Sequence, residues 1–161
     1  MPVRFIFTPD SAAFPSGSFP ELKAIISGSV YQCVLAFDGT ANTERALFYA
    51  YAASGWSGSL GACVVGRADA ATTASAVWEI SIDRIAPGTS FNASSFATSN
   101  SAIAGTIAGG SGLYVTALTP DDDALVSGDK FVIMLRRLWN NGSDTITGDY
   151  FMTELIVADG R

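Results

Sequence analysis

The stretch AVWEISIDRIAPG, residues 76–88, has the clearest structural pattern in the chain. Its apolar and polar side chains alternate, with Trp78, Ile80 and Ile82 set against Glu79, Ser81 and Asp83. Because successive side chains of a β-strand point to opposite faces of the sheet, this period of two predicts a half-buried strand. The turn pair Pro87-Gly88 ends the strand. The pattern therefore indicates a β protein and predicts that Trp78 is a core residue.

Comparable short runs follow one another through residues 28–161, with turn residues between them and no internal repeat. Seven or eight strands can be counted, and no segment has a convincing helical pattern. Strands of this kind pack as two antiparallel layers. We predict an all-β fold, an antiparallel jelly-roll β-sandwich of about eight strands with an extended N-terminal arm. Residues 89–112, which are small and polar, are predicted to form a long loop or a weak strand.

The end of the chain contains two apolar runs, in the stretch GDKFVIMLRRLWNNGSDTITGDYFMTELIVADG at residues 128–160. The break at Asn140-Asn141-Gly142 supplies residues that tolerate positive φ and favour turns. This pattern predicts a hairpin near the centre of the sandwich. A helix over 130–139 is the alternative, since apolar residues also occur there three and four apart. The flanking turn residues and the neighbouring β patterns favour the strand.

Two adjacent arginines, Arg136 and Arg137, lie inside the first of these runs. Because neighbours on a strand point to opposite faces, one guanidinium must point into the interior or into an interface. A guanidinium in such a place requires a carboxylate or carbonyl partner. The candidate carboxylates for this cross-strand pairing are those of Glu79, Asp83 and Glu154.

The first 27 residues differ from the rest, because they hold four of the six prolines and four of the ten phenylalanines. Proline disfavours both helix and central strand. We predict that residues 1–27 form an extended arm and that residues 28–161 form the sandwich domain. The aromatic anchors of this arm are Phe5, Phe7, Phe14 and Phe19. The alternative is an arm folded back on its own domain with its rings in the core, and a first strand at Val3–Thr8.

The composition excludes several classes of function. A chain of 161 residues fits one domain with a real core. The net charge of −6 argues against nucleic acid as a partner, since phosphate binding needs clustered Lys and Arg. No run approaches the ~18 apolar residues of a membrane span, and the first residues do not resemble a secretion signal. Charged residues make up 15% of the chain, which indicates either a surface covered by a partner or a neutral Ser/Thr-rich surface.

The residue types needed for most catalysis are missing. The sequence has no histidine, so neither Ser-His-Asp and Cys-His sites nor His-containing zinc sites can be built. Its two cysteines, Cys33 and Cys63, lie in apolar runs, which favours free buried thiols over a disulfide. Residues 121–123 are three aspartates, for which a solvated turn is favoured over a calcium site. We therefore predict a protein that is not an enzyme and that needs no cofactor or metal.

Aromatic residues raise the question of sugar binding. Trp78 belongs to the core face of its strand, whereas Trp56 lies in the turn sequence SGWSGS and is the more exposed candidate. Glycan contact through Trp56 and the 89–112 loop is thus an alternative function.

Several stretches together resemble small jelly-roll virion proteins of tailed phages, including capsid cement (decoration) proteins. The most telling are LAFDGTANTERALF at 35–48 and SGDKFVIMLRRLWNNGSDTITGDYFM at 127–152, and the resemblance covers residues 15–158. The two cysteines and the segment KAIISGSVYQC at 23–33 depart from the pattern of the group. Similar domains also occur in tail fibres and baseplates, so the resemblance implies a place in the virion less specifically than a fold.

The resemblance implies a cement protein on the outer surface of the capsid, with the major capsid protein as its partner. It would be a homo-oligomer, with a homotrimer favoured and a homodimer second, and without nucleic acid or membrane contact. We predict that Phe5, Phe7, Phe14, Phe19 and Leu22 make the capsid or subunit contact, since aromatic anchors dominate interface energies. Deleting residues 1–22 is then expected to leave a folded domain that no longer decorates capsids. The alternative is a tail fibre or baseplate module that binds host-surface glycan.

Overall fold

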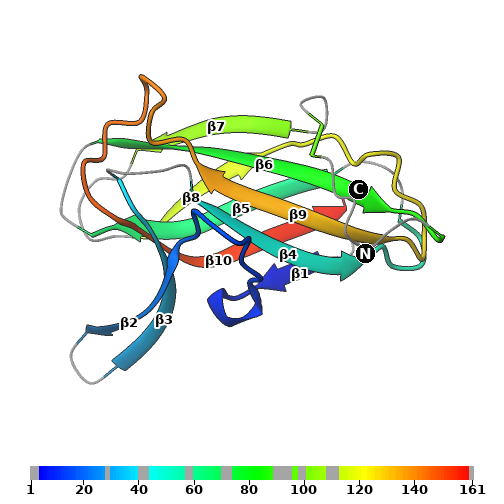
Figure 1. Ribbon diagram of the computed structural model, residues 1–161, viewed down its shortest axis with the longest axis horizontal. Helices are drawn as coiled ribbons and strands as arrows, with labels where there is room; N and C mark the ends of the chain where they lie inside the picture. Colours follow the sequence, from blue (N-terminus) through cyan, green and yellow to red (C-terminus); the bar gives the residue numbers. More distant parts are fainter. Residues whose placement is uncertain are drawn as a thin grey trace.

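The computed structural model contains two antiparallel β-sheets packed face to face (Figure 1). It describes residues 4–27, 30–39, 44–56, 60–69, 74–88, 96–97, 101–107 and 113–159. Sheet A has the order β2-β3-β10-β5-β8, with β1 also paired to β10, and sheet B has the order β4-β9-β6-β7. The strands of sheet A are β1 (Arg4–Phe7), β2 (Glu21–Ser27), β3 (Val30–Phe37), β5 (Leu60–Ala68), β8 (Tyr114–Leu118) and β10 (Tyr150–Asp159). Those of sheet B are β4 (Arg45–Tyr51), β6 (Ser75–Ile85), β7 (Ser101–Ile107) and β9 (Lys130–Arg137).

The connectivity confirms the predicted jelly-roll sandwich. Eight strands divide into two four-stranded layers, β3-β10-β5-β8 and β4-β9-β6-β7, and the chain crosses between the layers as a jelly roll requires. β1 and β2 are additions to this framework, both in sheet A. In the part of the chain that the structure describes, no helix is long and apolar enough to span a membrane.

The core lies between the two sheets and contains the predicted face of β6. Trp78, Ile80 and Ile82 are fully buried, and the Trp78 ring makes edge-to-face contacts with Phe37 and Tyr150 at centroid distances of 4.9 and 5.0 Å. Burial raises the pKa of Tyr150. The alternation of residues 76–88 thus identified the core face correctly, but the prediction of a half-buried strand is wrong. Glu79, Ser81 and Asp83, on the other face of β6, are buried as well.

The prediction of a hairpin at residues 128–160 is wrong. β9 is a strand, as predicted, but it pairs with β4 and β6 in sheet B, whereas β10 pairs with β3, β5 and β1 in sheet A. The connection at residues 138–149 therefore crosses from one sheet to the other. A hairpin and a crossing between sheets have the same strand–turn–strand pattern in sequence. The pattern therefore does not show which sheet the second strand joins.

Residues 4–27 are folded back on their own domain, which is the alternative to an extended arm. β1 lies antiparallel to the second half of β10, and residues 9–18 continue along the edge of β4. Ala13 exchanges two backbone hydrogen bonds with Leu47, and the Arg45 N–H donates to the carbonyl of Ser18. The segment therefore covers part of an edge that would otherwise expose backbone groups.

Candidate interaction surface

The five predicted contact residues divide into a buried and an exposed group. Phe7 is 8% exposed and packs against Phe48 at a centroid distance of 5.3 Å, so it is part of the core. Phe5 is partly buried and contacts the rings of Phe7, Trp56 and Phe131 at 6.2, 6.4 and 5.8 Å. These two rings fill the end of the sandwich and are not available as surface anchors in this chain.

Phe14, Phe19 and Leu22 are exposed, with 39%, 49% and 49% of their surface accessible. The rings of Phe14 and Phe19 lie 5.5 Å apart, so they form a pair directly before β2. Such a pair keeps two large apolar side chains in contact with water. We call it the Phe14–Phe19 pair.

β2 and β3 form a hairpin that extends beyond the body of the sandwich (Figure 1). The pairing between β3 and β10 in the described chain runs from Leu35 to Phe37, while the β2–β3 pairing spans both strands from end to end. Within the described residues, β2 and β3 therefore pair with each other in the outer half of the hairpin, beyond the part of β3 that pairs with β10.

One side of this hairpin continues the core face of sheet A. Leu22 lies opposite the core residue Leu35, and directly opposed residues of an antiparallel pair point to the same face. Ala24 and Cys33, which oppose each other, and Tyr31 follow at intervals of two and are all exposed, Tyr31 by 74%. We call Leu22, Ala24, Tyr31 and Cys33 the hairpin face. This uncharged surface would be buried if a second layer covered it.

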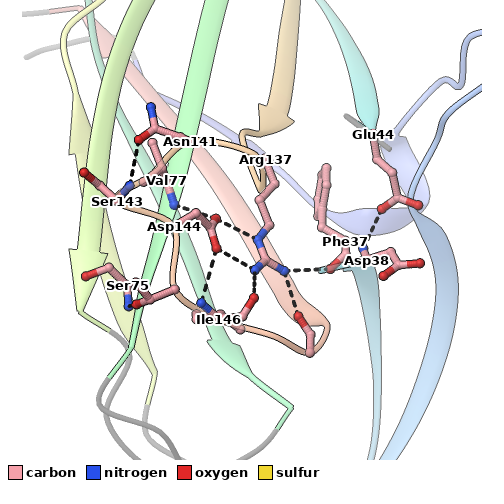
Figure 2. Close-up of polar contacts among 12 residues, drawn as sticks. Phe37, Asp38, Glu44, Ser75, Val77, Arg137, Asn141, Ser143, Asp144 and Ile146 are labelled. Carbon is pink, nitrogen blue, oxygen red and sulfur yellow. Dashed lines mark hydrogen bonds and ion pairs between the residues drawn. The ribbon is translucent and has the colours of Figure 1, made fainter. Parts of the chain in front are cut away.

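A buried arginine holds the loops at the root of the hairpin (Figure 2). The guanidinium of Arg137 donates five hydrogen bonds: to both carboxylate oxygens of Asp144 at 3.0 and 2.8 Å, and to the carbonyls of Phe37, Gly148 and Ile146 at 3.3, 2.8 and 2.5 Å. The side chains of Arg137 and Asp144 are 1% and 0% exposed. Arg137 thus ties the end of β3 to the crossing connection.

The carboxylate of Asp144 has further donors, as Figure 2 also shows. It accepts hydrogen bonds from the backbone N–H groups of Val77 and Ile146 at 2.9 and 3.3 Å. A Cβ at Gly39 would collide with the backbone of Gly148, so the two loops approach as closely as glycine allows. This network gives the hairpin a fixed base from which to project.

Arg136 and Arg137 therefore do point to opposite faces, as predicted. Arg136 forms its ion pair with Glu79, one of the three candidate carboxylates. Asp144, which holds Arg137, was not among them. Asp144 lies in the loop after Asn140-Asn141-Gly142, where an aspartate has the pattern of a turn residue. The sequence carries no signal that this loop folds back under β9.

Lys23 and Glu44 lie near this root. Lys23 donates to the carboxylate of Asp149 at 2.9 Å, and this hydrogen bond raises the pKa of Lys23. Glu44 accepts a hydrogen bond from the N–H of Asp38 at 2.6 Å. Burial raises the pKa of Glu44, the hydrogen bond from Asp38 lowers it in part, and the negative charges of Asp38 and Asp149 raise it further.

The Glu44→Gln variant is expected to be more stable than the wild type at pH 7 and equally stable at about pH 3. Because the pKa of Glu44 is higher in the folded than in the unfolded chain, its proton favours folding. This contribution is present at low pH and is lost as the pH rises through the folded-state pKa. Urea denaturation at several pH values measures the difference. A difference that stays constant with pH would contradict this reasoning.

Trp56 is not the exposed residue that its turn sequence indicated. It is 9% exposed and its ring lies against Phe5 and Phe131, with centroid distances of 6.4 and 6.0 Å. Trp56 therefore does not offer an exposed ring for glycan contact in this fold. The other part of the predicted glycan contact, the 89–112 loop, falls largely outside the described residues, although Ser101–Ile107 forms β7.

The structure also shows the positions of the cysteines and of the aspartate run. Cys33 and Cys63 are free, as predicted, but Cys33 is exposed and Cys63 is half-buried. In the aspartate run at residues 121–123, Asp123 accepts a hydrogen bond from the Arg84 N–H at 2.8 Å, so this turn is fastened to β6. Among the described residues no group of three or more metal-ligating side chains could hold an ion.

Sequence reasoning missed three exposed tyrosines, Tyr31, Tyr49 and Tyr51, which are 74%, 38% and 63% accessible. Each lies in a run that reads as a strand, and alternation alone places each on one of two faces. Whether that face is covered depends on the extent of the opposite layer, which no local pattern records.

No family model matches this chain, and no curated protein matches it. Among solved structures, it is similar to the CBM36-1 domain of a multidomain xylanase from the hindgut metagenome of Trinervitermes trinervoides. The TM-score is 0.53 at 13% sequence identity, with 96% of each chain covered. At this identity the similarity is one of fold, and it agrees with the β-sandwich described above.

Proposed function

We propose that this protein is a structural protein of a tailed-phage virion, a cement protein that binds the outside of the major capsid shell and bridges neighbouring capsomers. The resemblance of residues 15–158 to such proteins supports a place in the virion. The exposed apolar surface formed by the hairpin face and the Phe14–Phe19 pair supports a role in binding. Large apolar side chains left exposed on a folded domain often mark protein–protein contact sites.

The proposed mechanism is mechanical. A homo-oligomer, with a trimer favoured over a dimer, would add interface area between capsomers and so resist the pressure of packaged DNA. The net charge of −6 suits a position outside the shell, where the protein does not contact nucleic acid. Of the predicted contact residues, Phe14, Phe19 and Leu22 retain this role in the proposal, and Phe5 and Phe7 support the fold.

The triple variant Phe14→Ser/Phe19→Ser/Leu22→Ser of the full chain is expected to bind capsids at least about tenfold more weakly, because aromatic and apolar anchors dominate interface energies. Capsids assembled from the major capsid protein of the same phage, without cement protein, would be mixed with each variant and the bound fraction measured by sedimentation. Val115→Ser, at a residue 59% exposed on the far edge of sheet A, is the matched control.

If the triple variant bound capsids at full occupancy, the proposed contact would be wrong. A gene beside that of the major capsid protein would support the capsid position, whereas a gene among tail genes would support a fibre or baseplate module. In the glycan-binding form of that alternative Trp56 is no longer an exposed candidate, and at 13% identity the similarity to the solved neighbour is one of fold. The capsid proposal is therefore the one retained.

A further inference from the structure

A strip of aromatic and basic side chains follows the outer face of sheet B. In β4 the even-numbered Ala46 and Phe48 are fully buried in the core, so the odd-numbered residues point away from it. The charged and aromatic residues of this face on β4 and its neighbour β9 form what we call the β4 strip, which consists of Arg45, Tyr49, Tyr51, Lys130 and Arg136. Leu47, which opposes Met134, lies between its two ends. The strip is distinct from the hairpin face, which lies on sheet A.

One end of the β4 strip is a pair of tyrosine rings with a shared cation. Lys130 lies directly opposite Tyr51, and its ammonium is 5.2 Å from the ring centroid of Tyr49 and 5.9 Å from that of Tyr51. Cation–π contacts of this length hold the rings and the charge together. Because the rings remain 38% and 63% exposed, they present aromatic surface beside a positive charge.

The other end of the β4 strip places two arginines side by side. Arg45 lies directly opposite Arg136, and like charges in this position repel each other. Burial, and then the charge of Arg45, lower the pKa of Arg136, although Glu79 pairs with it. Glu79 neutralises the charge of Arg136, so Arg45 is the cation that a bound anion would meet at this end.

The backbone edge beside the β4 strip is already in use. The N–H and carbonyl of Leu47 are bonded to Ala13, and the Arg45 N–H is bonded to Ser18. A peptide could not add to this part of the edge as a further strand without displacing the N-terminal segment. A ligand must therefore lie across the side chains, where the structure offers ring faces and cations.

We propose that the β4 strip binds an anionic polysaccharide chain. The apolar C–H faces of the sugar rings would stack on Tyr49 and Tyr51, and carboxylate or sulfate groups would bind Lys130 and Arg45. Residues two apart on one strand are about 7 Å apart, and Arg45 and Tyr51 are about 20 Å apart, so the strip has the length of several sugar units. This proposal does not rest on the capsid function, since the strip and the hairpin face share no residue.

The test measures binding of the full chain to immobilised dextran sulfate, alginate and polygalacturonate at about 50 mM salt, with uncharged dextran as the matched neutral polymer. We expect the wild type to bind at least one anionic polymer and not dextran. The double variant Tyr49→Ala/Tyr51→Ala should lose at least about tenfold in affinity, since stacking supplies most of the specific contact. Arg45→Gln should weaken binding, more strongly at low than at high salt. Leu113→Ala, at a residue 60% exposed outside the strip, should bind as the wild type does.

Three results would overturn the proposal: no binding to any of the anionic polymers, undiminished binding by the double tyrosine variant, or equal binding to dextran. Polyglutamate serves as the peptide polyanion. If it bound as tightly as the polysaccharides and in the same tyrosine-dependent way, the ligand would be an acidic peptide and not a glycan. Since a β-sandwich variant could unfold, circular dichroism of each protein confirms the fold before binding is compared.

Discussion

Replacing Arg137 with methionine is expected to lower the free energy of unfolding by about 3–5 kcal/mol, the typical cost of breaking a buried ion pair by removing one partner. This cost arises from the buried groups that lose their partner. Asp144 would keep a fully buried carboxylate without its cation, and the carbonyls of Phe37, Gly148 and Ile146 would lose a donor. Urea denaturation followed by tryptophan fluorescence measures the change.

Two further variants make this expectation specific to the buried pair. Arg4→Met, at an exposed arginine of β1, should change the free energy of unfolding by no more than about 0.5 kcal/mol. The double variant Arg137→Met/Asp144→Asn should lose less than the two single variants added together, because a neutral amide leaves no buried charge. If the free energy of unfolding of Arg137→Met lay within about 1 kcal/mol of the wild-type value, the network would not stabilise this fold.

The sequence predicted the fold well because alternation is a local property. The set Trp78, Ile80 and Ile82 could be assigned to the core from residues 76–88 alone, and the structure buries all three. The same logic showed that Arg136 and Arg137 point to opposite faces. It could not say which of them lies inside, because that depends on a loop that returns under β9 with Asp144 at its centre.

The site was harder to predict because exposure is a tertiary property. Trp56 has a turn sequence on both sides, yet rings from β1 and β9, far away in the chain, cover it. Tyr31 lies in a strand, yet it is exposed, in the part of the hairpin beyond the β3–β10 pairing. In both cases the deciding fact is where another segment ends, and no window of local sequence contains it.

The same point revises the role of the first residues. The sequence alone predicts that a deletion of residues 1–22 leaves the domain folded, but in the structure this deletion would remove β1 from β10 and two rings from the core. Loss of capsid binding in that truncation would not distinguish a lost contact from a damaged fold. Single substitutions separate the two, because Phe7 and Phe19 differ in exposure while being chemically identical.

Phe7→Ala is expected to lower the free energy of unfolding by about 3–5 kcal/mol, the range for truncating a buried phenylalanine. The ring is 8% exposed and packs against Phe48 and Phe5, so its removal leaves a cavity between sheet A and sheet B. The matched Phe19→Ala change, at a ring 49% exposed, should alter stability by no more than about 0.5 kcal/mol.

Capsid binding should show the reverse order if the proposed contact is correct. At a temperature where both variants are folded, Phe19→Ala should bind more weakly than Phe7→Ala, since its ring belongs to the exposed surface and Phe7 does not. Equal stability of the two variants would contradict the placement of β1 in the core. Equal capsid binding, together with the expected difference in stability, would support the position of β1 but would show that the Phe14–Phe19 pair is not part of the interface. The two measurements together thus test the fold of the N-terminal segment and its function separately.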